Sequence, residues 1–154
     1  MTDAFIALGS NVGDREAHLA AALEKLCGLP GTRVLKISRW IETEPQGGPP
    51  QPPFLNGAAE IQTALEPRAL LERLQQIERE LGRPADHPRW AARTIDLDIL
   101  SYGHTIIDEP GLTIPHPLMH ERRFALEPMA EIAPDWIHPV FHQSARELLD
   151  HAHR

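Results

Sequence analysis

Residues 93–100 have the sequence Arg-Thr-Ile-Asp-Leu-Asp-Ile-Leu, and this segment carries the clearest chemical signal in the chain. Apolar and polar side chains alternate through it, which is the pattern of a strand with one buried face. Asp96 and Asp98 then project together from the opposite face, although Asp disfavours strands. Paired carboxylates suit Mg²⁺ and the nearby Arg89 and Arg93 suit phosphate, so the segment predicts a phosphoryl-transfer site. The alternative is a solvated acidic strand that binds no metal.

The composition is typical of a soluble globular protein. The chain has 154 residues, of which 42% are hydrophobic and 24% charged, and these values predict one domain over residues 1–154. The net charge of −7 argues against a general nucleic-acid-binding protein. No apolar run approaches the ~20 residues of a membrane span, and the first residues lack the features of a signal peptide. We therefore expect a cytoplasmic monomer that binds neither nucleic acid nor membranes.

Cysteine and histidine give no sign of a zinc site. The single cysteine, Cys27, excludes an internal disulfide, and its place at the end of a helical pattern predicts a position in or near the core. His116 and His120 are four residues apart, but Pro115 and Pro117 make a regular helix there unfavourable. No other Cys or His spacing resembles a zinc site.

Local patterns predict the order β-α-β-β-α-β over the first hundred residues. Strands are expected at 5–8, 33–42, 54–63 and 93–100, and helices at 15–27 and 67–81. Beyond them we expect a hairpin around 102–107, helical segments at 119–126 and 128–132, and a last helix at 145–150. The order is that of the split βαβ, ferredoxin-like folds. The predicted fold class is thus α+β, with a ferredoxin-like core, C-terminal additions and an antiparallel sheet between helices in three layers.

A proline-rich stretch separates two of the predicted strands. Residues 44–53 contain five prolines and two glycines, so they can form neither a helix nor a central strand. A long loop inside a compact domain is often a lid or a binding loop. A flexible connection without a binding role is the alternative.

Further segments accompany the Arg-Thr-Ile-Asp-Leu-Asp sequence in a defined order. They are Ile6-Ala7-Leu8-Gly9-Ser10-Asn11, Phe54-Leu55-Asn56, Glu78 with Gly82-Arg83, Arg89-Trp90, Ile114-Pro115-His116-Pro117, Arg122 with Phe124, and Glu131-Ile132-Ala133-Pro134. Together they span nearly the whole chain and resemble the 6-hydroxymethyl-7,8-dihydropterin pyrophosphokinase family of folate biosynthesis. Residues 93–98 are the most specific part of this resemblance.

The resemblance implies that ATP donates its β,γ-pyrophosphoryl group to the hydroxymethyl oxygen of a reduced pterin, with release of AMP. Such a reaction depends on positioning and charge neutralisation. Asp96 and Asp98 would hold two Mg²⁺ ions, with Arg83 and Arg93 completing the catalytic set. The implied ATP-binding residues are Gln75, Arg89, Arg93, Ile99, Thr113, His116 and Arg122. The implied pterin-binding residues are Gly9, Thr43, Gln46, Phe54, Asn56, Trp90 and Phe124.

Some of these assignments have structural alternatives. Phe54, Trp90 and Phe124 could be ordinary core residues, and Glu78 is expected to support the loop that follows it. The chain also departs from the family pattern: Ala91-Ala92 stand where Gly-Pro is frequent, and Ala85 and Gly111 stand where basic residues occur. Fewer cations near the triphosphate would weaken ATP binding or slow the reaction.

Two other functions fit part of the sequence. Nucleotide-sugar glycosyltransferases also use an Asp-x-Asp pair, but they usually need a larger nucleotide-binding domain than 154 residues allow. A non-catalytic, ferredoxin-like ligand-binding module is the second alternative. In such a module the Asp pair would tolerate replacement without loss of a reaction.

Overall fold

The computed structural model describes residues 1–44, 52–82 and 94–152. The strands are β1 (Thr2–Ser10), β2 (Thr32–Ile37), β3 (Ile41–Thr43), β4 (Phe54–Thr63), β5 (Asp96–Tyr102), β6 (Ile107–Glu109) and β7 (Leu112–Ile114). The α-helices are α1 (Arg15–Cys27), α2 (Pro67–Glu80), α3 (Arg123–Ile132) and α4 (Ala145–His151), with a short 3₁₀ helix η1 (Met119–Glu121) before α3.

The main sheet is antiparallel and has the strand order β2-β4-β1-β5, with β3 also paired to β4. β4 lies between β1 and β2, which α1 connects, and β1 lies between β4 and β5, which α2 connects. These are two split βαβ units, so the ferredoxin-like α+β prediction is confirmed.

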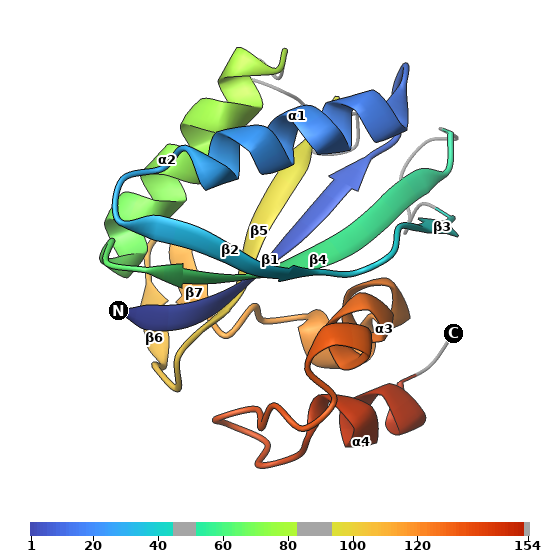
Figure 1. Cartoon of the computed structure of the whole chain (residues 1–154). Coiled ribbons are helices and arrows are strands. Elements are labelled where there is room, and N and C mark those ends of the chain that lie inside the picture. The colour runs from blue at the N-terminus through green and yellow to red at the C-terminus, as the bar shows by residue number, and fades with distance from the viewer. Residues whose placement is uncertain (45–51, 83–93, 153–154) are drawn as a thin grey trace.

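The sheet separates two layers of helices (Figure 1). α1 and α2 cover one face, where Ile6, Leu8, Leu19, Leu70 and Leu74 are among the fully buried side chains. On the other face α3 packs against the sheet and α4 packs on α3, around a second cluster that includes Phe5, Ala58, Leu126, Met129 and Leu148. The three layers match the prediction.

None of the helices in the described residues has the length and apolar character needed to span a lipid bilayer.

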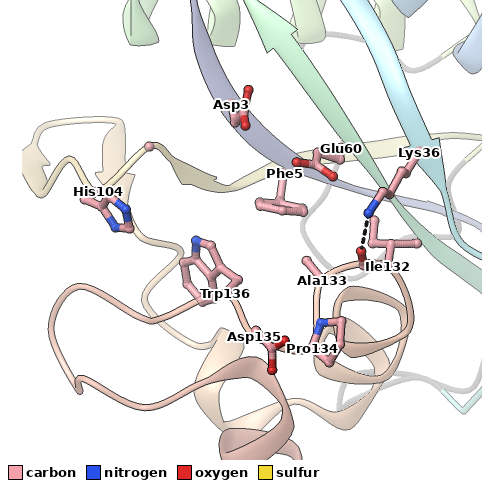
Figure 2. Close-up of a pocket in the computed structure, with 11 residues that line it drawn as sticks. Asp3, Phe5, Lys36, Glu60, His104, Ile132, Ala133, Pro134, Asp135 and Trp136 are labelled. Carbon is pink, nitrogen blue, oxygen red and sulfur yellow. Dashed lines mark hydrogen bonds between the residues drawn. The ribbon is translucent and has the colours of Figure 1, made fainter.

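The α3 face of the sheet contains a cavity of about 390 Å³ near the start of β1 (Figure 2). Its lining includes Phe5 and Trp136, whose rings meet edge to face at 6.2 Å, together with the carboxylates Asp3 and Glu60. Asp3 precedes Gly9 by six residues on one strand, which corresponds to about 20 Å. None of the site residues predicted from sequence lines this cavity.

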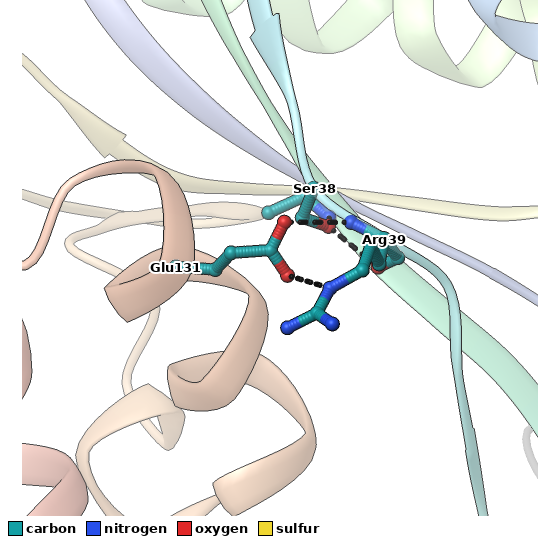
Figure 3. A network of polar contacts seen from close by, with 4 residues as sticks. Ser38, Arg39 and Glu131 are labelled. Carbon is teal, nitrogen blue, oxygen red and sulfur yellow. Dashed lines mark hydrogen bonds and ion pairs between the residues drawn. The ribbon is translucent and has the colours of Figure 1, made fainter.

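The predicted strand 33–42 is divided, and Ser38 explains the break. The Ser38 hydroxyl accepts a hydrogen bond from the Ala58 amide at 2.8 Å, so a side chain takes a place that a strand partner would otherwise fill. Arg39 then turns toward α3, where its backbone N–H and its Nε donate to the Glu131 carboxylate at 3.0 and 3.2 Å (Figure 3). Trp40 packs over Gly57, whose missing side chain leaves room for the ring. β3 begins after this junction.

The predicted hairpin at 102–107 is wrong. A turn does form there, because the Thr105 amide donates to the Tyr102 carbonyl at 3.0 Å, but the Gly103 amide bonds to Asp3 of β1. β6 pairs instead with β7, across a two-residue connection at Pro110-Gly111 in which Gly111 has a φ of 77°. Such a positive φ favours glycine in tight hairpin turns.

Two smaller predictions, on the C-terminal helical segments and on Cys27, are wrong. Residues 123–132 form one helix rather than two segments, although Pro128 lies inside it. The buried stripe that includes Leu126, Met129 and Ile132 outweighs the hydrogen bond that this proline cannot donate. Cys27 is exposed, because it lies in the last turn of α1 on the side away from the buried residues Leu19, Ala22 and Leu26.

Candidate active site

Asp96 and Asp98 lie on the α3 face of β5, as the alternation predicts. The residues between and beside them, Ile95, Leu97 and Ile99, are buried in the core under α1 and α2. Because successive side chains of a strand point to opposite faces, both carboxylates project to the other side. Each is half-buried. Two carboxylates therefore share one face at the start of an edge strand.

Asn56, Gly9 and Asp96 form a row across three adjacent strands. Gly9 of β1 pairs with Asn56 of β4 on one side and with Asp96 of β5 on the other. Directly paired residues point to the same face, so the Asn56 amide and the Asp96 carboxylate flank the glycine. A Cβ at position 9 would lie 2.6 Å from Oδ1 of Asn56 and 3.5 Å from the Phe54 ring. Glycine is needed there because the Asn56 side chain occupies that space.

The Asn56 side chain also contacts β3. Its Nδ2 donates a short hydrogen bond to the Thr43 hydroxyl, and Thr43 pairs with Phe54 in the sheet. Phe54 and Asn56 are two residues apart on β4, so both face the same side as Gly9. Four of the predicted pterin-binding residues, Gly9, Thr43, Phe54 and Asn56, are thus neighbours on the face that carries the Asp pair. An amide beside an aromatic ring can bind a flat heterocycle through its edge and its face.

His116 links the Asp pair to the start of α3. Its backbone N–H donates to the Leu100 carbonyl of β5 at 2.9 Å. Burial lowers the pKa of His116, the nearby Arg122 lowers it further and Asp96 raises it. Nδ1 accepts a hydrogen bond from the Leu118 amide at 3.2 Å, so the neutral ring carries its proton on Nε2. His116 is therefore a neutral donor within electrostatic range of Asp96 and Arg122.

Arg122 and Phe124 stand at the first turn of α3. The Arg122 guanidinium carbon lies 5.4 Å from the centre of the Phe124 ring, which is a cation–π distance. Both side chains are half-buried, so neither is a fully buried core residue.

Glu78 makes a contact with β5 that its sequence position did not indicate, whereas most of the loop that it was expected to support lies outside the described residues. It is buried on α2, and its Oε2 accepts a hydrogen bond from the Leu97 amide at 2.8 Å. Leu97 stands between the two aspartates, so this carboxylate holds the strand that carries them. A long-range contact between a side chain and a backbone amide leaves no spacing pattern in the sequence. The only sequence signal is that position 78 borders the buried stripe of α2, formed by residues such as Leu70, Leu74 and Ile77.

The other predicted ATP-binding residues are more dispersed. Gln75 is exposed on α2 and Thr113 is exposed on β7, two residues before the Pro115-His116 segment. The Ile99 side chain lies in the core on the opposite face from the Asp pair, so a nucleotide on the α3 face could meet only its backbone. Gln46, Arg83, Arg89, Trp90 and Arg93 lie outside the described residues.

The donor set at Asp96 and Asp98 suits an ion that is only partly bound by protein. Within the described part of the chain, no group of three or more His, Cys, Asp or Glu is arranged to hold a metal. Mg²⁺ commonly takes one or two carboxylates and completes its shell with water and phosphate oxygens. Two carboxylates on one strand fit that requirement.

Comparison with known proteins identifies the family. The family model described as 7,8-dihydro-6-hydroxymethylpterin-pyrophosphokinase (HPPK) matches residues 5–134. The chain belongs to this family.

Relatives in the HPPK family are similar over most of their length. The chain is 50% identical over 129 residues to 2-amino-4-hydroxy-6-hydroxymethyldihydropteridine pyrophosphokinase of Bacillus subtilis, covering 84% of this chain and 77% of the relative. It is 44% identical over 149 residues to the protein of the same name from Methylorubrum extorquens, covering 97% and 92%.

Solved structures share the HPPK fold at low sequence identity. A structure of a Plasmodium falciparum HPPK-DHPS triple mutant with SDX-DHP has a TM-score of 0.78 and 16% identity. It covers 97% of this chain, which in turn spans 44% of that longer chain. Family membership, inferred first from residues 93–98 and the accompanying motifs, is thereby confirmed.

Proposed function

We propose that this HPPK-family chain transfers the pyrophosphoryl group of ATP to 6-hydroxymethyl-7,8-dihydropterin. The hydroxymethyl oxygen attacks the β-phosphorus, AMP leaves, and the product is the pterin diphosphate used in folate biosynthesis. The observation that carries the proposal is the row of Asn56, Gly9 and Asp96 on paired strands, in a chain of this family. The row sets a group that can recognise a heterocycle beside carboxylates that can hold a metal-bound phosphate.

In this proposal the pterin lies on the Asn56 side of Gly9. The Asn56 amide and the Thr43 hydroxyl form hydrogen bonds with the ring edge, while Phe54 and Phe124 supply aromatic faces. Gln46 and Trp90 complete the pterin-binding set by family resemblance. Gly9 contributes by having no side chain, because a methyl group there would displace Asn56.

The triphosphate lies on the other side of Gly9. Asp96 and Asp98 would hold two Mg²⁺ ions, which when bound neutralise phosphate charge and stabilise the entering and leaving oxygens. The His116 ring donates from Nε2, and Arg122 adds a positive charge. By resemblance Arg83, Arg89 and Arg93 contribute further cations, and Gln75, Ile99 and Thr113 contact the nucleotide.

Charge neutralisation and positioning are the main contributions that these side chains can make. Neither a covalent intermediate nor a nucleophilic side chain is required, because the acceptor alcohol is itself the nucleophile. The half-buried setting of the two carboxylates strengthens their electrostatic interactions relative to bulk water. We place the reaction in the cytoplasm, where ATP is available, and expect a monomer that binds no nucleic acid or membrane.

The test is incubation of the protein with ATP, Mg²⁺ and 6-hydroxymethyl-7,8-dihydropterin, followed by chromatography of the nucleotides. Release of AMP in equal amount with pterin diphosphate is expected. Formation of ADP would indicate an ordinary kinase instead. Hydrolysis of ATP without any change in the pterin would refute the acceptor assignment.

A further inference from the structure

Two consecutive prolines, Pro52 and Pro53, lead into β4 and limit how its first residues can be held by hydrogen bonds. Neither has a backbone N–H, so the backbone of this stretch can form hydrogen bonds only through its carbonyl groups. Both carbonyls accept hydrogen bonds from side chains near the β1–α1 turn. Asn11 Nδ2 donates to the Pro52 carbonyl and Arg15 Nη1 donates to the Pro53 carbonyl, each at 3.1 Å.

Arg15 makes a second contact, with β3. Its Nη2 lies 2.9 Å from Oε2 of Glu42, the residue before Thr43. One planar guanidinium therefore joins the end of β3 to the residue that precedes β4. We call the side chains of Asn11, Arg15 and Glu42 the stem clamp.

The stem clamp lies behind the residues that are proposed to bind the pterin. Glu42 pairs with Leu55, a core residue on the α1 face, whereas the next pair, Thr43 and Phe54, belongs to the opposite face. Because β3 is only three residues long, its pairing with β4 is short. We propose that Arg15, together with Asn11, is a positioning residue that holds Thr43 and Phe54 in register for pterin binding. This inference rests on the proposed function.

Loss of the Asn11 side chain and loss of the Arg15 side chain would affect the free energy of unfolding differently. The Asn11 side chain is buried, so removing its hydrogen bonds is destabilising as well as disruptive. The Arg15 side chain is 29% exposed and its partner Glu42 is 59% exposed. Ion pairs this accessible contribute little to the free energy of unfolding. Replacing Arg15 is therefore expected to alter the site while leaving the fold intact.

The experiment compares Arg15→Ala with Arg33→Ala. Arg33 also joins two strands, through a bond of 2.9 Å from its Nη2 to Oε1 of Gln62, but it lies at the far end of β2. For Arg15→Ala we expect the KM for 6-hydroxymethyl-7,8-dihydropterin to rise at least about fivefold. The KM for ATP should stay within about twofold, because the Asp pair is on another strand. Arg33→Ala should leave both constants unchanged.

A second readout separates this inference from the proposed function. In ¹H–¹⁵N NMR spectra of the protein without substrates, Arg15→Ala should shift the amide signals of Thr43, Phe54 and the Asn56 side chain. The control variant should not shift them. Unchanged signals, or an unchanged pterin KM in an active enzyme, would overturn the positioning role. Shifted signals in a protein that does not use the pterin would support the clamp and reject the proposed substrate.

Discussion

The Glu78 carboxylate on α2 accepts a hydrogen bond from the Leu97 amide on β5, at 2.8 Å. Among the strands of the described residues β5 lies at the edge of the sheet, so none of them pairs with this amide on its outer side. Glu78 thus satisfies an edge amide, and it does so between Asp96 and Asp98. A helix on one face of the sheet fixes the carboxylates that project from the other.

Removing this carboxylate should weaken both the fold and the reaction. In Glu78→Ala the Leu97 amide loses a buried acceptor, which costs about 1–3 kcal/mol of unfolding free energy. Turnover should fall as well, because the strand that carries the Asp pair is less firmly held. Glu78→Gln keeps an acceptor oxygen and should lie closer to the wild type. Urea unfolding and AMP release measure the two effects, and an Ala variant as stable as the wild type would argue against this anchor.

Replacing one carboxylate of the Asp pair should remove activity without unfolding the protein. Asp98→Asn preserves size but removes the charge that would hold Mg²⁺, so turnover is expected to fall about 100-fold or more. Asp150→Asn on α4 is the matched control, since Asp150 is exposed and that helix carries none of the predicted site residues. Circular dichroism and AMP release distinguish the outcomes. Wild-type turnover in Asp98→Asn would exclude a metal-binding role.

A single methyl group on Gly9 should separate pterin binding from folding. In Gly9→Ala the new Cβ would lie 2.6 Å from Oδ1 of Asn56, closer than real contacts allow, so the amide must move. We expect the KM for the pterin to rise about tenfold, equivalent to about 1.4 kcal/mol. In Gly28→Ala the nearest atom would be 3.6 Å away, so that variant should behave as the wild type. Equal pterin KM values in the two variants would contradict the close approach of Asn56.

Stability should decrease in mild acid because of His138. Burial, aided by His120 and His142, lowers the pKa of His138 from 6.5 to about 4. A lowered pKa means that the unfolded chain binds the proton more readily than the folded one. Above pH 6.5 the histidine is neutral in both states, so the folded protein has its full stability there. It is lost progressively as the pH falls from 6.5 toward 4. Urea unfolding at pH 7.5 and pH 5 should reveal this loss.

The same experiment on His138→Asn tests the assignment. Nδ1 of His138 accepts hydrogen bonds from the amides of Val140 and Phe141, at 3.1 and 3.3 Å, and an Asn oxygen can replace it as acceptor. The variant should lose less stability between the two pH values than the wild type does. Some dependence should persist, because the pKa of His116 is also lowered. An unchanged pH dependence would mean that other groups cause it.

Elements with local signals could be predicted from the sequence. Helix α1 begins where Asp14 caps it, with the side chain accepting a hydrogen bond from the Ala17 amide at 3.1 Å. Helix α2 begins at Pro67, and β4 has the predicted bounds of 54 and 63. The shared face of the Asp96 and Asp98 side chains followed from the alternation of apolar and polar residues alone. Each of these features depends on residues within a few positions of one another.

Features that depend on distant partners could not be predicted. The break between β2 and β3 requires the Ser38 hydroxyl to meet the Ala58 amide, twenty residues away. Glu78 and Leu97 are nineteen residues apart, and Arg15 meets Pro53 across thirty-eight. No periodicity connects such pairs. The shared face of Asp96 and Asp98 was therefore predictable from the sequence, whereas side chains such as Glu78 and Arg15, which contact distant segments, became evident only in the folded chain.

The row of Asn56, Gly9 and Asp96 sets a fixed backbone spacing across the candidate active site. Adjacent strands are about 4.8 Å apart, so two steps across the sheet place the Cα atoms of Asn56 and Asp96 about 10 Å apart. Backbone hydrogen bonding sets this interval, and no side-chain movement can shorten it. In the proposed function, an alcohol attached nearer to, or farther from, the recognised edge of its heterocycle would meet the wrong part of the triphosphate. Acceptor choice is then a matter of length as much as of chemical complementarity.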